Sequence, residues 1–268
     1  MRAFRLAYDG TGYRGYQRQP HGETVENALF DALSSLGIEF DDGTPVGYAA
    51  AGRTDAGVSA RAQTVAFDAP SWLTPRALNG DLPDDVCAWA WADAPGGFHA
   101  TYDATERTYR YFLYGTRLDD ERVVAACERL SGAHDFHNLT PDDAGTEREL
   151  SVAAERRGSF SVVDCSAAGF ARQLVRRLVS LVAAVGRGDR DLGFVDRVLD
   201  AAPLAGRDGI APANPEPLVL LDVRYPCLEF TVDETAAERT HEVFETRRRE
   251  RLAGVRVADA LSSGLDEP

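Results

Sequence analysis

Apolar and polar residues alternate over several short stretches, which is the pattern of strands with one buried face. The first stretch is residues 3–8, where Phe4, Leu6 and Tyr8 fall on one face. Similar stretches, rich in β-branched and aromatic residues, occupy 63–69, 86–92, 107–115, 159–165 and 218–225. The alternation predicts a sheet built from strands that are spread along the whole chain.

Helical periodicity is found between these stretches. In residues 24–37 apolar residues recur at three- and four-residue spacing, Thr24 is suited to cap the N-terminus, and Gly37 is suited to end the helix. Further helices are predicted at 75–80, 120–131, 169–186 and 193–201, with an amphipathic helix in the tail after residue 228. In 169–186 the predicted buried stripe is Phe170, Leu174, Leu178, Leu181 and Val185.

The order of these elements predicts the fold class. Strands and helices are mixed without the regular strand–helix–strand spacing of a doubly wound sheet, so α+β is the better class. A boundary is predicted near residues 103–106, which divides the chain into two α+β halves, 1–103 and 104–227, and a helical tail, 228–268.

Composition changes how the charge is interpreted. The chain has 268 residues and a net charge of −14, and because it has no lysine, all 29 basic residues are arginines. Acidic residues are scattered along it, which suits a high-salt cytoplasm where screening acts over about 3 Å at 1 M salt. We therefore predict a halophilic source. No apolar run approaches the roughly 20 residues of a membrane span, and the N-terminus lacks a signal-peptide pattern, so we expect a cytoplasmic protein.

Metal and redox sites are not predicted. Cys87, Cys127, Cys165 and Cys227 are far apart and form no C-x-x-C pair. His134 and His137 lie three apart with one aspartate between them, which is an incomplete ligand set. We expect no metal.

The glycine pattern G-x-G-x-x-G at residues 10–15 raises the possibility of a dinucleotide-binding oxidoreductase. In such a site the last glycine lies in a helix that continues for several turns. Here Pro20 and Gly22 prevent that helix, and the next one begins only at Thr24. A nucleotide cofactor is therefore not expected.

Three other patterns leave two interpretations open. Asp55, Arg53 and Arg61 lie in one glycine-rich loop before a strand that resumes at Thr64, and this cluster suits either a simple turn or an acid facing a polyanion. Tyr109, in a strand of alternating aromatics, suits either a core position or a base-stacking one. Arg176, beside the apolar stripe and four residues after Arg172, suits either a solvated position or pairing with a buried carboxylate.

Six blocks of sequence, in order within residues 4–225, resemble the TruA family of tRNA pseudouridine synthases. The blocks are DGTGYRGYQRQP…TVENAL, GRTDAGVSARAQ, LNGDLPDDV, FHATYDATERTYRY, LSGAHDF and GFARQLVRRLV. The resemblance implies two similar α+β halves with antiparallel or mixed sheets side by side around a central RNA-binding cleft, usually in a homodimer that binds tRNA. It also implies isomerisation of uridine to pseudouridine at positions 38, 39 and 40 of the anticodon stem-loop, without metal or organic cofactor.

The resemblance also assigns roles to particular residues. Asp55 matches the catalytic aspartate, and Arg53 matches the arginine that takes the place of the flipped nucleotide. Tyr109 matches the tyrosine that stacks on the target uracil and helps to remove its C5 proton, while Arg176 matches the arginine that pairs with the aspartate. The further expected RNA contacts are Arg14, Tyr16, Gln17, Arg61 and Arg172.

Two departures from the family pattern stand out. Tyr16 takes the place of a common Trp, and Ser59 takes the place of a common His, which removes one RNA contact or loop anchor. The tail beyond about residue 228 lies outside the resemblance. The alternative function, a non-catalytic tRNA-binding or folding protein with the same cleft, is disfavoured because pure binding does not require Asp55.

Overall fold

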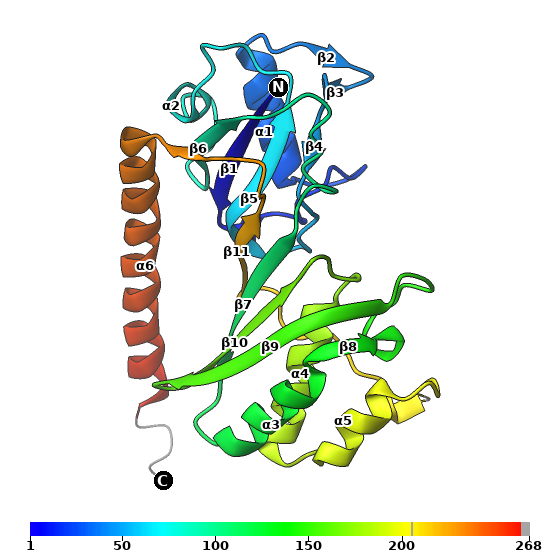
Figure 1. The fold of residues 1–268 in the computed structure, drawn as a ribbon. Coiled ribbons are helices and arrows are strands. Elements are labelled where there is room, and N and C mark those ends of the chain that lie inside the picture. The colour runs from blue at the N-terminus through cyan, green and yellow to red at the C-terminus, as the bar shows by residue number, and fades with distance from the viewer. Residues whose placement is uncertain (205, 264–268) are drawn as a thin grey trace.

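One ten-stranded sheet runs through the computed structural model, which describes residues 1–204 and 206–263 (Figure 1). In spatial order its strands are β12 (Thr231–Val232), β6 (Val86–Asp93), β1 (Arg2–Tyr8), β5 (Ser59–Phe67), β11 (Leu218–Arg224), β7 (Glu106–Tyr114), β10 (Phe160–Ala167), β9 (Glu147–Arg157) and β8 (Gly132–Asp135), with β4 (Ala49–Ala50) also paired to β5. A separate hairpin consists of β2 (Phe40–Asp41) and β3 (Thr44–Pro45).

The first half of the chain packs its helices on strands β1, β5 and β6. Helix α1 (Val25–Ser35) begins where Thr24 accepts a hydrogen bond from the Asn27 amide, and Gly37 follows its end with a φ of +72°. The caps predicted from the sequence are therefore confirmed. Helix α2 (Pro75–Leu78) is a single turn capped by Thr74. Apolar side chains of α1 and the sheet close this first core.

The second half packs three helices on strands β7 to β10 and forms its own core (Figure 1). These helices are α3 (Asp120–Leu130), α4 (Leu174–Arg187) and α5 (Leu192–Leu199). Leu178 and Val185 on α4 are completely buried, as its apolar stripe predicts. Single 3-10 turns occupy η1 (Gly10–Gly12), η2 (His137–Leu139) and η3 (Gly206–Asp208).

Strand β11 joins the two halves. It pairs in parallel with β5 and in antiparallel with β7, so Leu220 has Ala60 on one side and Tyr109 on the other. This register brings Tyr109 next to the loop that precedes β5. The predicted α+β class with a mixed sheet is confirmed.

The tail forms one long helix, α6 (Glu234–Ser262), which runs beside both halves (Figure 1). Asp233 caps its N-terminus, and Ala236 and Thr240 are buried against the first half. From residue 248 to residue 263 every side chain is exposed. No helix within residues 1–204 and 206–263 has the length and apolar character that crossing a membrane requires.

One predicted helix begins later than expected, and one long strand was not predicted. The helix expected at 169–186 starts only at Leu174, because Gln173 has a φ of +60°, in the left-handed region that interrupts a helix. Phe170 and Arg172 therefore lie in a loop and do not belong to the helical stripe. Strand β9 was not predicted because it is mostly charged, and its only buried side chains are Leu150 and Val152.

Candidate active site

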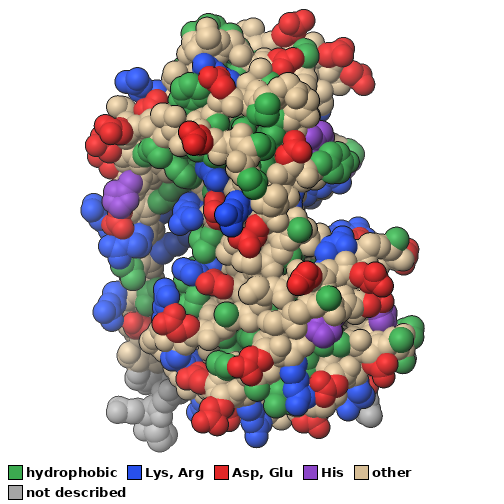
Figure 2. Space-filling view, viewed as in Figure 1, with side chains coloured by type: hydrophobic (Ala, Val, Ile, Leu, Met, Phe, Trp, Pro, Cys, Tyr) green, Lys and Arg blue, Asp and Glu red, His purple; other side chains and the backbone are tan. Residues whose placement is uncertain are grey.

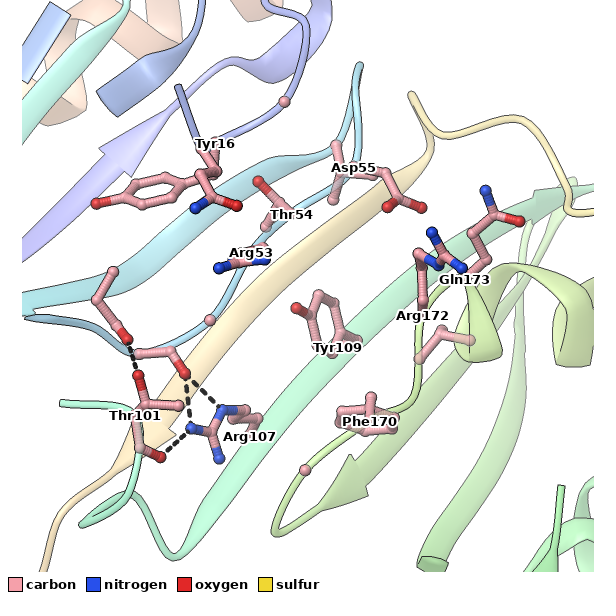
Figure 3. Close-up of a pocket in the computed structure, with 18 of the residues that line it drawn as sticks. Tyr16, Arg53, Thr54, Asp55, Thr101, Arg107, Tyr109, Phe170, Arg172 and Gln173 are labelled. Atoms are coloured by element: carbon pink, nitrogen blue, oxygen red, sulfur yellow. Dashed lines mark hydrogen bonds between the residues drawn. The ribbon is translucent and has the colours of Figure 1, made fainter. Parts of the chain in front are cut away.

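A cleft of about 1470 Å³ lies between the two halves of the chain. In the space-filling view the molecule is hollowed on one side between its upper and lower parts (Figure 2). Both halves contribute to the lining, chiefly residues 14–17, 48–56, 99–102 and 168–176. The cleft contains most of the residues that the sequence singled out (Figure 3).

An ion pair lies in the wall of this cleft. Arg176 on α4 donates from Nη1 to Oδ2 of Asp55 over 2.8 Å, and from Nε to the carbonyl oxygen of Ala213, also over 2.8 Å. The Arg176 side chain is 13% exposed and the Asp55 side chain 31%. A largely buried guanidinium with two fixed acceptors thus holds a carboxylate that opens to the cleft, although the two residues are 121 positions apart.

Tyr109 lies in the same cleft, near Asp55 (Figure 3). The ring of Phe170 meets it edge-on, with centroids 5.2 Å apart and planes at 88°. Burial raises the pKa of Tyr109 to about 12, and Arg107 opposes this rise while Asp55 adds to it. The hydroxyl therefore stays neutral near pH 7. Sequence reasoning did not single out Phe170 as a site residue, because its spacing fits the helical stripe.

The cleft also presents two arginines that have no side-chain partner in the part of the chain that the structure describes. Arg53 is exposed, and neither its side chain nor that of Arg14 has a hydrogen bond or ion pair with the described residues. Arg172, in contrast, pairs with Asp142 over 3.2 Å. Gln17 lines the same wall. Arg53 and Arg14 are therefore the cations most available to a polyanion in the cleft.

The buried side chain of Arg107 connects three segments of the chain that line the cleft. It is 7% exposed and donates to the carbonyl oxygens of Ala51 (3.0 and 2.6 Å), Thr101 (2.7 Å) and Ala168 (Figure 3). Among the described residues it has no carboxylate partner, and all four of its hydrogen bonds go to backbone carbonyl oxygens. One buried cation thus fixes the Asp55 loop, the 99–103 turn and the segment that leads to Phe170. Sequence reasoning missed Arg107, because nothing in its spacing distinguishes it from a surface arginine.

The glycine pattern at 10–15 packs against the Asp55 loop. The Tyr16 amide donates to the Thr54 carbonyl over 3.0 Å. Gly15 has a φ of +96°, and a Cβ there would lie 2.9 Å from the same carbonyl oxygen, while a Cβ at Gly10 would lie 2.1 Å from the Val58 oxygen. The two glycines therefore permit the loops to approach closely, which gives the pattern a packing role.

Arg61 was expected beside Asp55, and this expectation is wrong. Along β5 its side chain has the same parity as Ser59 and lines a different cavity of about 590 Å³, between the sheet and α6. Its Nε donates to the Leu221 carbonyl over 3.0 Å. Ser59 lines the same cavity and accepts from the Gly10 amide over 3.1 Å, so this position still anchors a loop.

Tyr16 was also expected to contact RNA. Its side chain is only 1% exposed, and its hydroxyl lies 2.6 Å from the hydroxyl of Tyr48. This burial argues against a direct contact with a ligand and gives Tyr16 a packing role under the cleft.

Metal ligands are not gathered in the part of the chain that the structure describes. No group of three or more His, Cys, Asp or Glu side chains there could hold a metal ion. Cys87, Cys127 and Cys165 are buried, and burial raises the pKa of Cys127 to about 12. These thiols are therefore packing residues.

Comparison with known proteins gives consistent matches. A family described as tRNA pseudouridine synthase matches residues 126–226. A relative from Natronomonas pharaonis, named tRNA pseudouridine synthase A, is 70% identical over 98% of this chain and 99% of its own length. A protein of the same name from Haloarcula marismortui is 56% identical over 99% of this chain and 100% of its own length. Their origin in halophilic archaea confirms the predicted high-salt source.

Solved structures resemble the chain only distantly. A chain in a crystal structure of a Cbf5-Nop10-Gar1 complex matches with a TM-score of 0.36 and 12% identity, over 68% of this chain and 45% of that one. Likeness at this level supports no argument about the site.

Proposed function

The chain belongs to the family of tRNA pseudouridine synthases, and from this premise we propose that it isomerises uridine at positions 38, 39 and 40 of the tRNA anticodon stem-loop. The observation that carries the proposal is the contact between Asp55 and Arg176 in a cleft that also holds Tyr109 and two arginines, Arg14 and Arg53, whose side chains have no partner among the described residues. Because tRNA is the substrate, we place the activity in the cytoplasm.

The reaction requires a positioned carboxylate. The N1–C1′ bond of uridine breaks, the uracil turns, a C5–C1′ bond forms, C5 loses its proton and N1 gains one. Asp55 is the catalytic carboxylate of this proposal, and Arg176 fixes its orientation before the substrate arrives. A preorganised ion pair of this kind avoids reorientation of the charge during the reaction.

The reaction also requires the uracil to leave its stack, which costs a few kcal/mol. The ring of Tyr109, held edge-on by Phe170, is the platform for the extruded uracil. Since its hydroxyl stays neutral near pH 7, Tyr109 contributes ring contact and a neutral hydroxyl near C5. Arg53, exposed and unpaired among the described residues, fills the space that the base leaves and binds phosphate, together with Arg14, Gln17 and Arg172.

Tritium release from C5-labelled uridine in a tRNA with U38 to U40 tests this function. We expect release by the wild type in molar KCl and none by Asp55→Asn. Asp164→Asn is the matched control, because Asp164 also pairs with an arginine, Arg110, over 2.7 Å but lies outside the cleft, and it should retain release. Equal release by Asp55→Asn contradicts the role of Asp55. Binding without release by the wild type favours the non-catalytic alternative.

We also propose that the protein is a homodimer. Phe112, Tyr114 and Phe160 are 40%, 68% and 40% exposed, and the ring of Phe160 contacts the other two. On α6, Leu252, Val255, Val257 and Leu261 are more than half exposed. Apolar surface of this extent is covered by a partner in many proteins. Sedimentation in molar KCl should give a dimer for the wild type and a monomer for Tyr114→Arg, and a monomeric wild type contradicts the proposal.

A further inference from the structure

A short turn at the mouth of the cleft displays an aromatic side chain that no role assigned above explains. Tyr102 lines the cleft and is 82% exposed, more than any other large apolar or aromatic residue in the described part of the chain. The ring of His99 lies against it, with centroids 4.3 Å apart and planes at 32°. One face of the tyrosine is therefore covered by His99, and the opposite face is open.

This turn is held in place on several sides. The His99 amide donates to Oδ2 of Asp103 over 2.7 Å, and the Tyr102 amide donates to the His99 carbonyl over 3.0 Å. Between them, Thr101 donates from Oγ1 to the Ala50 carbonyl over 2.6 Å, while its own carbonyl accepts from Arg107. The turn is thus fastened to the loop that carries Asp55 (Figure 3).

Exposure combined with rigid support separates Tyr102 from other exposed rings. Phe112, Tyr114 and Phe160 cover one another in part. Tyr102 has only the imidazole of His99 as a ring neighbour within the described residues. A tyrosine in this position adds nothing to either core, and its open face points to a ligand with a flat apolar surface.

We propose that Tyr102, supported by His99, is a stacking site for an unpaired nucleobase next to the target uridine. This inference rests on the proposed function. When the target base leaves its stack, its neighbour loses one stacking partner, and an aromatic ring near the Asp55 loop replaces it. Stacking on a ring tolerates every base, so the site accommodates targets with different neighbours.

Binding of an anticodon stem-loop RNA to Tyr102 variants tests the proposal. Tyr102→Ala should bind about tenfold more weakly than the wild type, which corresponds to the usual contribution of one base–aromatic stack. Tyr102→Phe should bind like the wild type, because stacking needs the ring and not the hydroxyl. Trp72→Ala is the control, since Trp72 is 53% exposed and does not line the cleft, and its binding should be unchanged.

A second measurement identifies the base. An RNA with an abasic site next to the target should lose about the same tenfold affinity for the wild type, and Tyr102→Ala should add no further loss. A 2-aminopurine at that position should be quenched by the wild type and by Tyr102→Phe but not by Tyr102→Ala. Additive losses, or equal quenching by Tyr102→Ala, overturn the proposal.

RNA binding tests the stacking site and tritium release tests the proposed function, so the two proposals can fail independently. If the wild type releases tritium and Tyr102→Ala binds the RNA equally well, the stacking site is wrong and the isomerase stands. If the wild type releases no tritium, the proposed function fails, whatever the binding data show.

Discussion

Replacement of Arg176 by Gln tests the ion pair that organises the cleft. The glutamine side chain is two bonds shorter, so its amide nitrogen stands where Nε now donates to the Ala213 carbonyl, while the charge and the Nη1 donor that binds Asp55 are lost. RNA contacts by Arg53 and Arg14 are left in place. We therefore expect Arg176→Gln to slow the chemical step much more than it weakens RNA binding.

The size of the effect follows from the geometry. A hydrogen bond to a charged group contributes about 1.5–3 kcal/mol. The Asp55 side chain is 31% exposed, so water replaces part of the lost contact and the lower part of this range applies. At about 1.4 kcal/mol per factor of ten, the single-turnover rate should fall roughly 10- to 30-fold. Affinity for the RNA should change by no more than about threefold.

Single-turnover tritium release and a separate binding titration measure the two quantities. Arg5→Gln is the control, because Arg5 also binds one carboxylate, that of Asp222 at 2.7 Å, and one carbonyl, that of Val223 at 2.8 Å, and is 11% exposed. It lies outside the cleft, so it should lower the melting temperature without slowing the chemical step. A rate within twofold of the wild type for Arg176→Gln, or equal slowing by Arg5→Gln, would refute the reasoning.

Three further predictions concern the loop, the pH dependence and the salt. Gly15→Ala should lower both the melting temperature and the rate of tritium release, because a Cβ meets the Thr54 carbonyl in a left-handed backbone, whereas Gly12→Ala, with open space around it, should change neither. Burial raises the pKa of Tyr109 from about 10 to about 12, so its contribution to the free energy of unfolding is fully present below pH 10 and is lost as the pH rises towards 12. In melting curves recorded between pH 10 and 12, Tyr109→Phe should therefore lose less stability than the wild type. The melting temperature should rise between dilute buffer and molar KCl, because 43 acidic residues face 29 arginines, and a fall would contradict the halophilic interpretation.

The local signals in the sequence predicted most elements correctly. Thr24 and Gly37 mark helix α1 because a cap needs only its own neighbours. Strand β9 was not predicted because its exposed face is charged and only Leu150 and Val152 on its other face are buried. Helix α4 begins at Leu174 and not at residue 169 as predicted, because Gln173 has a left-handed backbone conformation. The apolar spacing of the segment does not reveal this conformation.

The candidate site was predictable where residue type carries the chemistry. Asp55, Arg53, Tyr109 and Arg176 came from the family resemblance, and the structure brings all of them to one cleft. The prediction for Arg61 was wrong because side chains alternate between the two faces of a strand, and the Arg61 side chain lies on the face of β5 that lines the cavity beside α6. Arg107 and Tyr102 were missed because their importance depends on burial and on exposure, which only the folded chain defines.

Strand β11 sets the order in which the protein can be built. The core of the first half includes Leu220, Val223 and Tyr225, and the second core includes Leu218. All of these residues follow strands β1 to β10 in the chain, so they leave the ribosome after those strands. The N-terminal half therefore cannot close its core as it emerges, unlike a domain that folds during translation. A fragment that ends at residue 103 lacks both a strand and its apolar side chains, so the two halves complete their folding together, in one late step that waits for β11.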